Sequence, residues 1–113
     1  MKKVALLSLA LLLGPVSLPT FAANVQMKNK AVARRVFDEI FNQGKFEVAD
    51  QIYAKDFVNH GLTRDVGLQE DQTAARGWRQ AFPDLKMTVV QEIAEGDLVT
   101  VLWTGTGTNS GGR

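Results

Sequence analysis

The hydrophobic pattern of this chain changes at Pro83, and this change limits the possible folds more than any other feature. From Leu68 to Phe82 apolar residues recur at three- and four-residue spacing, which predicts a helix that Pro83 ends. After Asp84 apolar and polar residues alternate, which predicts a half-buried strand with one apolar face formed by Leu85, Met87, Val89 and Ile93. Helices therefore come first and strands follow.

Two more helices are predicted upstream. The first spans Asn29 to Gln43, with Asn29 as its N-cap and Gly44 at its end. A shorter helix from Phe46 to Tyr53 folds back on it. Phe57–Gly61 is too short for a helix and predicts a short strand or an extended turn, and 63–67 predicts a loop.

The strand after Asp84 continues into a long antiparallel hairpin. Glu95-Gly96-Asp97 is a tight turn, and Leu98 to Thr108 is rich in Val, Thr and Trp. We expect an α+β fold in which three helices pack on one face of a curved antiparallel sheet. Because a two-stranded hairpin is marginal by itself, we also expect an incomplete sheet and a chain truncated at its C-terminus; a flexible natural C-terminus is the alternative.

Residues 1–22 have the pattern of a secretory signal peptide. Lys2 and Lys3 precede an apolar run, which ends before the small residues around Phe21. The run is too short to span a membrane, so we expect no stable anchor after cleavage. Cleavage follows Ala22 or, alternatively, Ala23, and leaves one domain, residues 23–113, exported to the periplasm or secreted.

Composition excludes several classes of protein. The 113-residue sequence contains no cysteine, so stability cannot depend on disulfides. Without Lys2 and Lys3, the sequence has 11 basic and 12 acidic residues. A net charge close to zero argues against nucleic-acid binding. One histidine without cysteine also provides too few ligands for a typical metal site, so we expect none.

The order of five sequence segments resembles the SnoaL-like polyketide or ester cyclases of the nuclear transport factor two-like superfamily. The resemblance covers 29–112 and is carried by the segments Lys30–Phe37, Asn42–Gly44, Asp56–His60, Ala81–Leu85 and Glu95–Thr108. It implies a cone of helices wrapped against a bent sheet, with an apolar pocket at the wide end.

The same resemblance implies a chemistry. Family cyclases close a ring by intramolecular aldol condensation without cofactor or metal, using a carboxylate as acid and base. The usual acid/base Asp of the family lies in strands that would follow Arg113 and has no counterpart here, so we expect this fragment alone to be inactive. Dimerisation through the sheet is common in the superfamily, and we expect a homodimer of the full-length protein.

Four residues are candidates for the site. His60 is the predicted catalytic residue, because histidine exchanges protons near neutral pH, and it also belongs to the ligand-binding set: Asn59, His60, Trp78 and Trp103. The structural alternatives are a loop histidine, a turn-forming asparagine and aromatic residues of the core. Among nearby carboxylates, Asp56, Asp65 and Asp84, the last two are weak acid/base candidates.

These observations predict an exported domain that binds or transforms a small lipophilic carbonyl compound, by cyclase-like acid–base chemistry of lyase or isomerase type where it is catalytic. The alternative is a non-enzymatic binding module with the same pocket.

Overall fold

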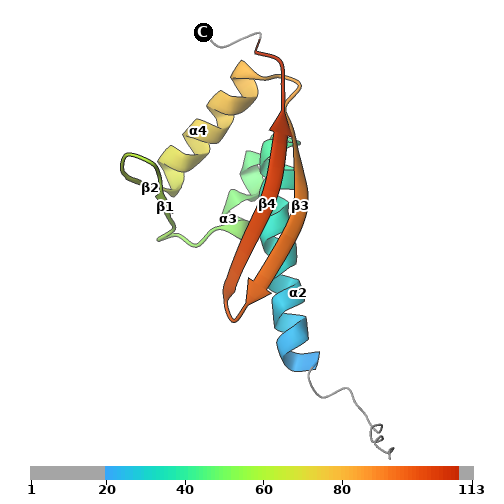
Figure 1. Ribbon diagram of the computed structural model, residues 1–113. Coiled ribbons are helices and arrows are strands. Elements are labelled where there is room, and N and C mark those ends of the chain that lie inside the picture. Colours follow the sequence, from blue (N-terminus) through green and yellow to red (C-terminus); the bar gives the residue numbers. More distant parts are fainter. Residues whose placement is uncertain (1–19, 110–113) are drawn as a thin grey trace, which may run out of the picture.

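The computed structural model describes residues 20–109, which form an α+β fold (Figure 1). Helices come first and the long hairpin last: α2 (Thr20–Arg35), η1 (Val36–Phe41), η2 (Phe46–Val48), α3 (Ala49–Ile52), β1 (Val58–His60), β2 (Asp65–Gly67), α4 (Leu68–Ala81), β3 (Lys86–Glu95) and β4 (Leu98–Thr106). The predicted fold class and the change from helix to strand after Pro83 are confirmed.

Most of the predicted signal peptide lies outside the described residues, and its last three positions form the start of α2. Within residues 20–109, no helix is both long enough and apolar enough to cross a membrane.

The first helix is longer than predicted. Residues 20–41 form one helix, α2 followed by η1, whereas the sequence predicted a start at Asn29. No glycine or proline lies between Thr20 and Gln43, so nothing in the backbone stops the helix there, and Asn29 lies inside it. The last turn is wide, because the N–H of Asn42 donates to the carbonyl of Phe37, five residues back, at 2.9 Å.

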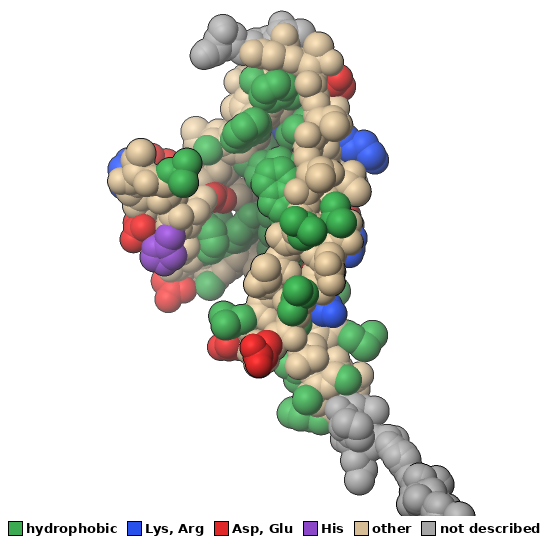
Figure 2. Space-filling view, in the orientation of Figure 1, with side chains coloured by type: hydrophobic (Ala, Val, Ile, Leu, Met, Phe, Trp, Pro, Cys, Tyr) green, Lys and Arg blue, Asp and Glu red, His purple; other side chains and the backbone are tan. Residues whose placement is uncertain are grey.

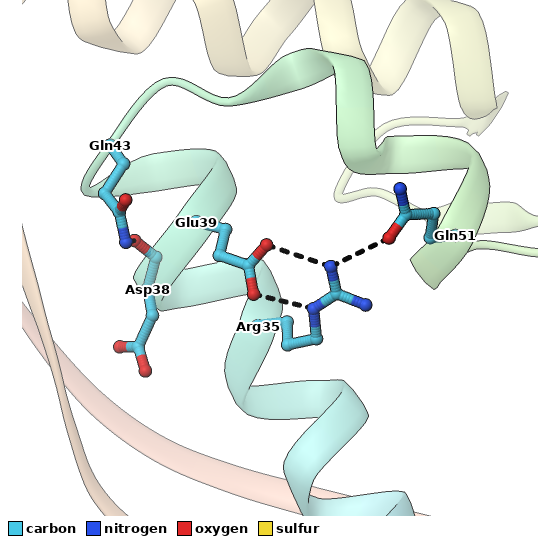
Figure 3. Close-up of polar contacts among 5 residues, drawn as sticks. All are labelled: Arg35, Asp38, Glu39, Gln43 and Gln51. Carbon is cyan, nitrogen blue, oxygen red and sulfur yellow. Dashed lines mark hydrogen bonds and ion pairs between the residues drawn. The ribbon is translucent and has the colours of Figure 1, made fainter.

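Arg35 ties this helix to α3 (Figure 3). Its Nε and Nη2 donate to the two carboxylate oxygens of Glu39 at 2.6 and 2.9 Å, and Nη2 also donates to Oε1 of Gln51 at 3.1 Å. The hydrogen bonds from Arg35 hold the pKa of Glu39 below its ordinary value. The short helix is therefore held back against the long one, as the sequence predicted.

The end of the first helix is the junction of the fold. Gly44 ends the helix as predicted, with φ at 69°, and a Cβ there would lie 2.8 Å from Nε of Arg79. Nη1 of Arg79, on α4, donates to the carbonyls of Phe41 at 2.7 Å and of Asn42 at 3.2 Å, so a cation caps the helix C-terminus. The Asn42 side chain in turn binds the backbone of Met87 on β3, donating to its carbonyl at 2.8 Å and accepting from its N–H at 2.7 Å.

The helices share a small apolar core. Ile40, Ala49 and Ala75 are buried, one each from η1, α3 and α4, and partly buried apolar side chains surround them: Phe41, Phe46, Val48, Ile52 and Tyr53. This core and the junction at Asn42 hold α4 beside the end of the first helix.

The segment 63–67, predicted as loop, contains a short strand. Asp65–Gly67 pairs antiparallel with the predicted strand around Asn59, and His60 lies opposite Asp65. Three residues are too few to show a hydrophobic period, so no strand could be predicted here, and pairing with β1 decides the structure.

The long hairpin is present, with two corrections. It turns at Gly96, whose φ is 57°, and β4 ends at Thr106 rather than Thr108. A β-bulge between Val89 and Gln91 shifts the register. One extra residue reverses the alternation, so Ile93 is exposed, whereas the sequence placed it on the same face as Met87.

The bulge instead turns Glu92 inward, toward α2. Its Oε1 accepts a hydrogen bond from Nη2 of Arg34 at 3.1 Å, and the Glu92 side chain is only 8% exposed. The long helix therefore packs along the hairpin through an ion pair in the half beyond the bulge (Figure 1).

We expect Asn42→Ala to lower the free energy of unfolding by about 1–3 kcal/mol, because it leaves the Met87 backbone groups without their partner. Urea denaturation measures the change. Gln43→Ala is the matched control, since it removes one exposed side-chain bond to the carbonyl of Asp38 and should cost less. Equal losses in the two variants would show that the junction is not the stronger contact.

Candidate functional site

A cleft of about 840 Å³ lies between the end of the first helix, α4 and the long hairpin. Figure 2 shows the hollow beside the hairpin, with hydrophobic side chains around it. Its walls are mostly apolar and aromatic, and the lining residues are Val36, Phe37, Phe41, Tyr53, Phe57, Asn59, Asp71, Trp78, Phe82, Leu85, Met87, Trp103, Gly105, Thr106 and Gly107. The size and lining are typical of small-molecule sites.

Aromatic pairs build the walls of the cleft. Trp78 stacks on Phe82 along α4, with ring centroids 5.6 Å apart, and Trp103 of β4 packs on Phe37 at 5.8 Å. Both tryptophans stay about half exposed, at 52% and 46%. Their rings therefore present apolar surface from two different elements to anything that enters.

A polar cluster reaches the same lining through Asn59 and Asp71. Nδ2 of Asn59 donates to Oδ1 of Asp71 at 2.6 Å, and Nε2 of Gln72 donates to Oδ2 of Asp71 at 3.1 Å. Tyr53 lines the cleft close enough to Asp71 to sense its charge. An apolar cleft with one group of hydrogen-bonding side chains can orient a ligand as well as enclose it.

Burial raises the pKa of Tyr53 to about 12, and the negative charge of Asp71 adds to the rise while a hydrogen bond from Gln72 opposes it. The phenol therefore keeps its proton at neutral pH. Its hydroxyl group can donate a hydrogen bond to a ligand oxygen.

A hydrogen bond between Thr108 and Asp84 holds the rim of the cleft just after the end of β4. The N–H of Thr108 donates to Oδ1 of Asp84 at 2.7 Å, and the hydrogen bonds from Thr108 keep the pKa of Asp84 below its ordinary value. A Cβ on Gly107 would lie 3.0 Å from Cβ of Phe82, so the backbone passes close to that ring. Asp84 thus fixes the position of one wall.

The structure brings three of the four predicted site residues to the cleft. Asn59, Trp78 and Trp103 are among its lining residues. His60 is not: its side chain is 79% exposed on the small hairpin, and Nδ1 lies 2.9 Å from Oδ1 of Asp65. The binding and catalytic roles of all four stay predictions.

Sequence reasoning missed Asp71 and Tyr53. Asp71 lies in the first turn of α4, where an acidic residue is ordinary because it complements the helix dipole. A signal was nevertheless present. Asp71, Ala75, Trp78 and Phe82 follow the four- and three-residue spacing of a single helix face, so the carboxylate lies in line with apolar residues.

Among residues 20–109, no group of three or more His, Cys, Asp or Glu side chains is arranged to hold a metal ion. The hydrogen-bonding side chains of Asn59, Asp71 and Tyr53 line the cleft.

Tyr53 is the one tyrosine of the sequence, so tyrosinate absorbance reports on it alone. We expect its titration midpoint near pH 12 in the folded protein, above the ordinary value of 10.0. Since the folded pKa is the higher one, this contribution to stability is complete below pH 10 and is lost as the pH rises through about 12. Tyr53→Phe should remove the signal, and a folded midpoint at the ordinary value would contradict the burial of this phenol.

The comparisons with known proteins agree with this geometry. A family model described as SnoaL-like polyketide cyclase matches residues 31–112. The fold is similar to the crystal structure of AclR from Streptomyces galilaeus, a proposed hydroxylase, with a TM-score of 0.66 and 24% identity. That match covers 74% of this chain and 53% of AclR, so the chain spans about half the length of AclR. The search of curated proteins found no match. The family model covers most of the sequence, and the chain therefore belongs to the SnoaL-like polyketide cyclase family.

Proposed function

We propose that the cleft binds a small lipophilic carbonyl compound. One observation carries the proposal: an aromatic cleft of about 840 Å³ contains a carboxylate and a protonated phenol in the same lining. The half-exposed rings of Trp78 and Trp103 favour a planar, apolar ligand. The Tyr53 hydroxyl supplies a donor for a carbonyl oxygen.

The family supports acid–base chemistry of the aldol type at this site. In such a reaction a base removes the proton beside one carbonyl, and the electron pair of the broken C–H bond forms an enolate. The enolate carbon then bonds to a second carbonyl carbon of the same molecule, and the new alkoxide takes up a proton. A neutral phenol such as Tyr53 stabilises the enolate oxygen by donating a hydrogen bond.

A non-enzymatic binding module is the second candidate, and one observation favours it. Both oxygens of Asp71 already accept hydrogen bonds from Asn59 and Gln72. A carboxylate that already accepts two hydrogen bonds has fewer acceptor positions left for a substrate proton.

Export to the periplasm or the medium is part of the proposal. It is supported by the basic start, apolar run and small residues of positions 1–22. Mass spectrometry of the mature N-terminus tests it, with Ala23 or Asn24 as the expected first residue.

Fluorescence tests the cleft directly, because the two tryptophans of the sequence both line it. We expect fluorenone, a planar aromatic ketone, to quench their emission saturably. Trp78→Phe and Trp103→Phe each leave one reporter and should give similar dissociation constants. Quenching that rises linearly in both variants, without saturation, would reject the cleft as the binding site.

Proton exchange separates the two functions. When a base removes a proton from the carbon beside the carbonyl of beta-tetralone, deuterium from the solvent replaces it. NMR follows this exchange. Catalysed exchange that exceeds the buffer rate and is lost in Tyr53→Phe would identify an acid–base enzyme. Saturable binding with exchange at the buffer rate would identify a binding module.

A further inference from the structure

We propose that Asp71 is the anchoring carboxylate of the cleft and that it accepts a hydrogen bond from a hydroxyl group of the ligand, an enol or a phenol. The inference rests on the proposed function of the cleft and adds the chemical group that the polar cluster recognises.

Asp71 is held in a fixed orientation by two neighbouring side chains. One amide donor binds each carboxylate oxygen, Nδ2 of Asn59 at 2.6 Å and Nε2 of Gln72 at 3.1 Å. The two donors come from β1 and from α4 itself, so the carboxylate plane is fixed from two directions. An ionised carboxylate has about four acceptor positions, and two therefore stay available. Asn59, a predicted ligand-binding residue, becomes on this geometry a positioning residue that acts through Asp71.

The side-chain amide of Gln72 has only one of its two polar atoms satisfied by a hydrogen bond among the described residues. Its side chain is buried, with the residue 8% exposed, and Oε1 has no hydrogen-bond donor among the described residues. A buried acceptor without a partner is costly. The amide nevertheless keeps Nε2 on Asp71, because the opposite orientation would place Oε1 against the carboxylate. The cluster thus leaves one acceptor unsatisfied while it holds the carboxylate.

The negative charge of Asp71 is not paired with a cation among the described residues. The ion pairs within residues 20–109 join Arg34 to Glu92, Arg35 to Glu39, His60 to Asp65 and Arg64 to Glu70, and none includes Asp71. Amide groups, which carry no net charge, are its polar contacts in the described part of the chain. The negative charge is therefore available to a donor on a ligand, and the apolar walls strengthen such a bond.

Tyr53 narrows the ligand group to a hydroxyl. An ammonium group could donate to Asp71 but has no lone pair to accept a hydrogen bond from the phenol of Tyr53, which lines the same cleft and keeps its proton at neutral pH. A hydroxyl group does both, donating to the carboxylate and accepting from the phenol. The cluster therefore favours an enol or a phenol over an amine.

Calorimetric titration at neutral pH with beta-naphthol and its methyl ether tests the inference, since the two differ in one donor proton. We expect the wild-type protein to prefer the naphthol by about tenfold or more. Asp71→Asn keeps the shape but makes the acceptor neutral, and should reduce that preference several-fold. Asp71→Leu removes the acceptor and should abolish it, which also covers the case in which one of the two variants does not fold.

Asp56→Asn is the matched control, because Asp56 is exposed and does not line the cleft, and it should keep the wild-type preference. Fluorenone, which has no donor, should bind all four proteins equally. An undiminished preference in folded Asp71→Asn, any preference in folded Asp71→Leu, or no preference in the wild type overturns the assignment of Asp71 alone. Failure of fluorenone to bind the wild type rejects the cleft proposal itself.

Discussion

The two hydrogen bonds between the Asn42 side chain and the Met87 backbone hold the domain together at one point. They join the end of the first helix to β3, and Arg79 joins α4 to the same turn through the carbonyls of Phe41 and Asn42. Because backbone polar groups that lose their partner are costly, the three elements are fixed where they meet. The cleft is the space enclosed between them, so its shape depends on this junction.

The β-bulge makes the two halves of the hairpin contact different parts of the molecule. Before it, Met87 and Val89 turn inward, and Met87 lines the cleft. Beyond it, the alternation is reversed and Glu92 turns inward to meet Arg34 on α2. One inserted residue therefore separates the part of the sheet that binds a ligand in our proposal from the part that carries the long helix.

In our proposal, the polar cluster selects its ligand because the surrounding cleft lining is mostly apolar. Asp71 and Tyr53 are partly buried in a mostly apolar lining, so a correctly placed ligand donor gains more there than it would on a fully exposed surface. His60 shows the contrast, since its contact with Asp65 lies on an exposed hairpin. In our proposal the cleft binds a ligand, and the step from binding to catalysis depends on whether Asp71 acts as an acceptor or as a base.

The sequence by itself determined the helices, the hairpin and the family, because Pro83, Gly44 and the hydrophobic periods act locally along the chain. It also identified three side chains that line the cleft, Asn59, Trp78 and Trp103. Tertiary structure alone decided the exposure of His60, the pairing of Asp65–Gly67 and the reversal at the bulge. It also placed Asp71 near Asn59 and Tyr53. All of these features depend on contacts between different helices and strands, and a local sequence pattern carries no information on such contacts.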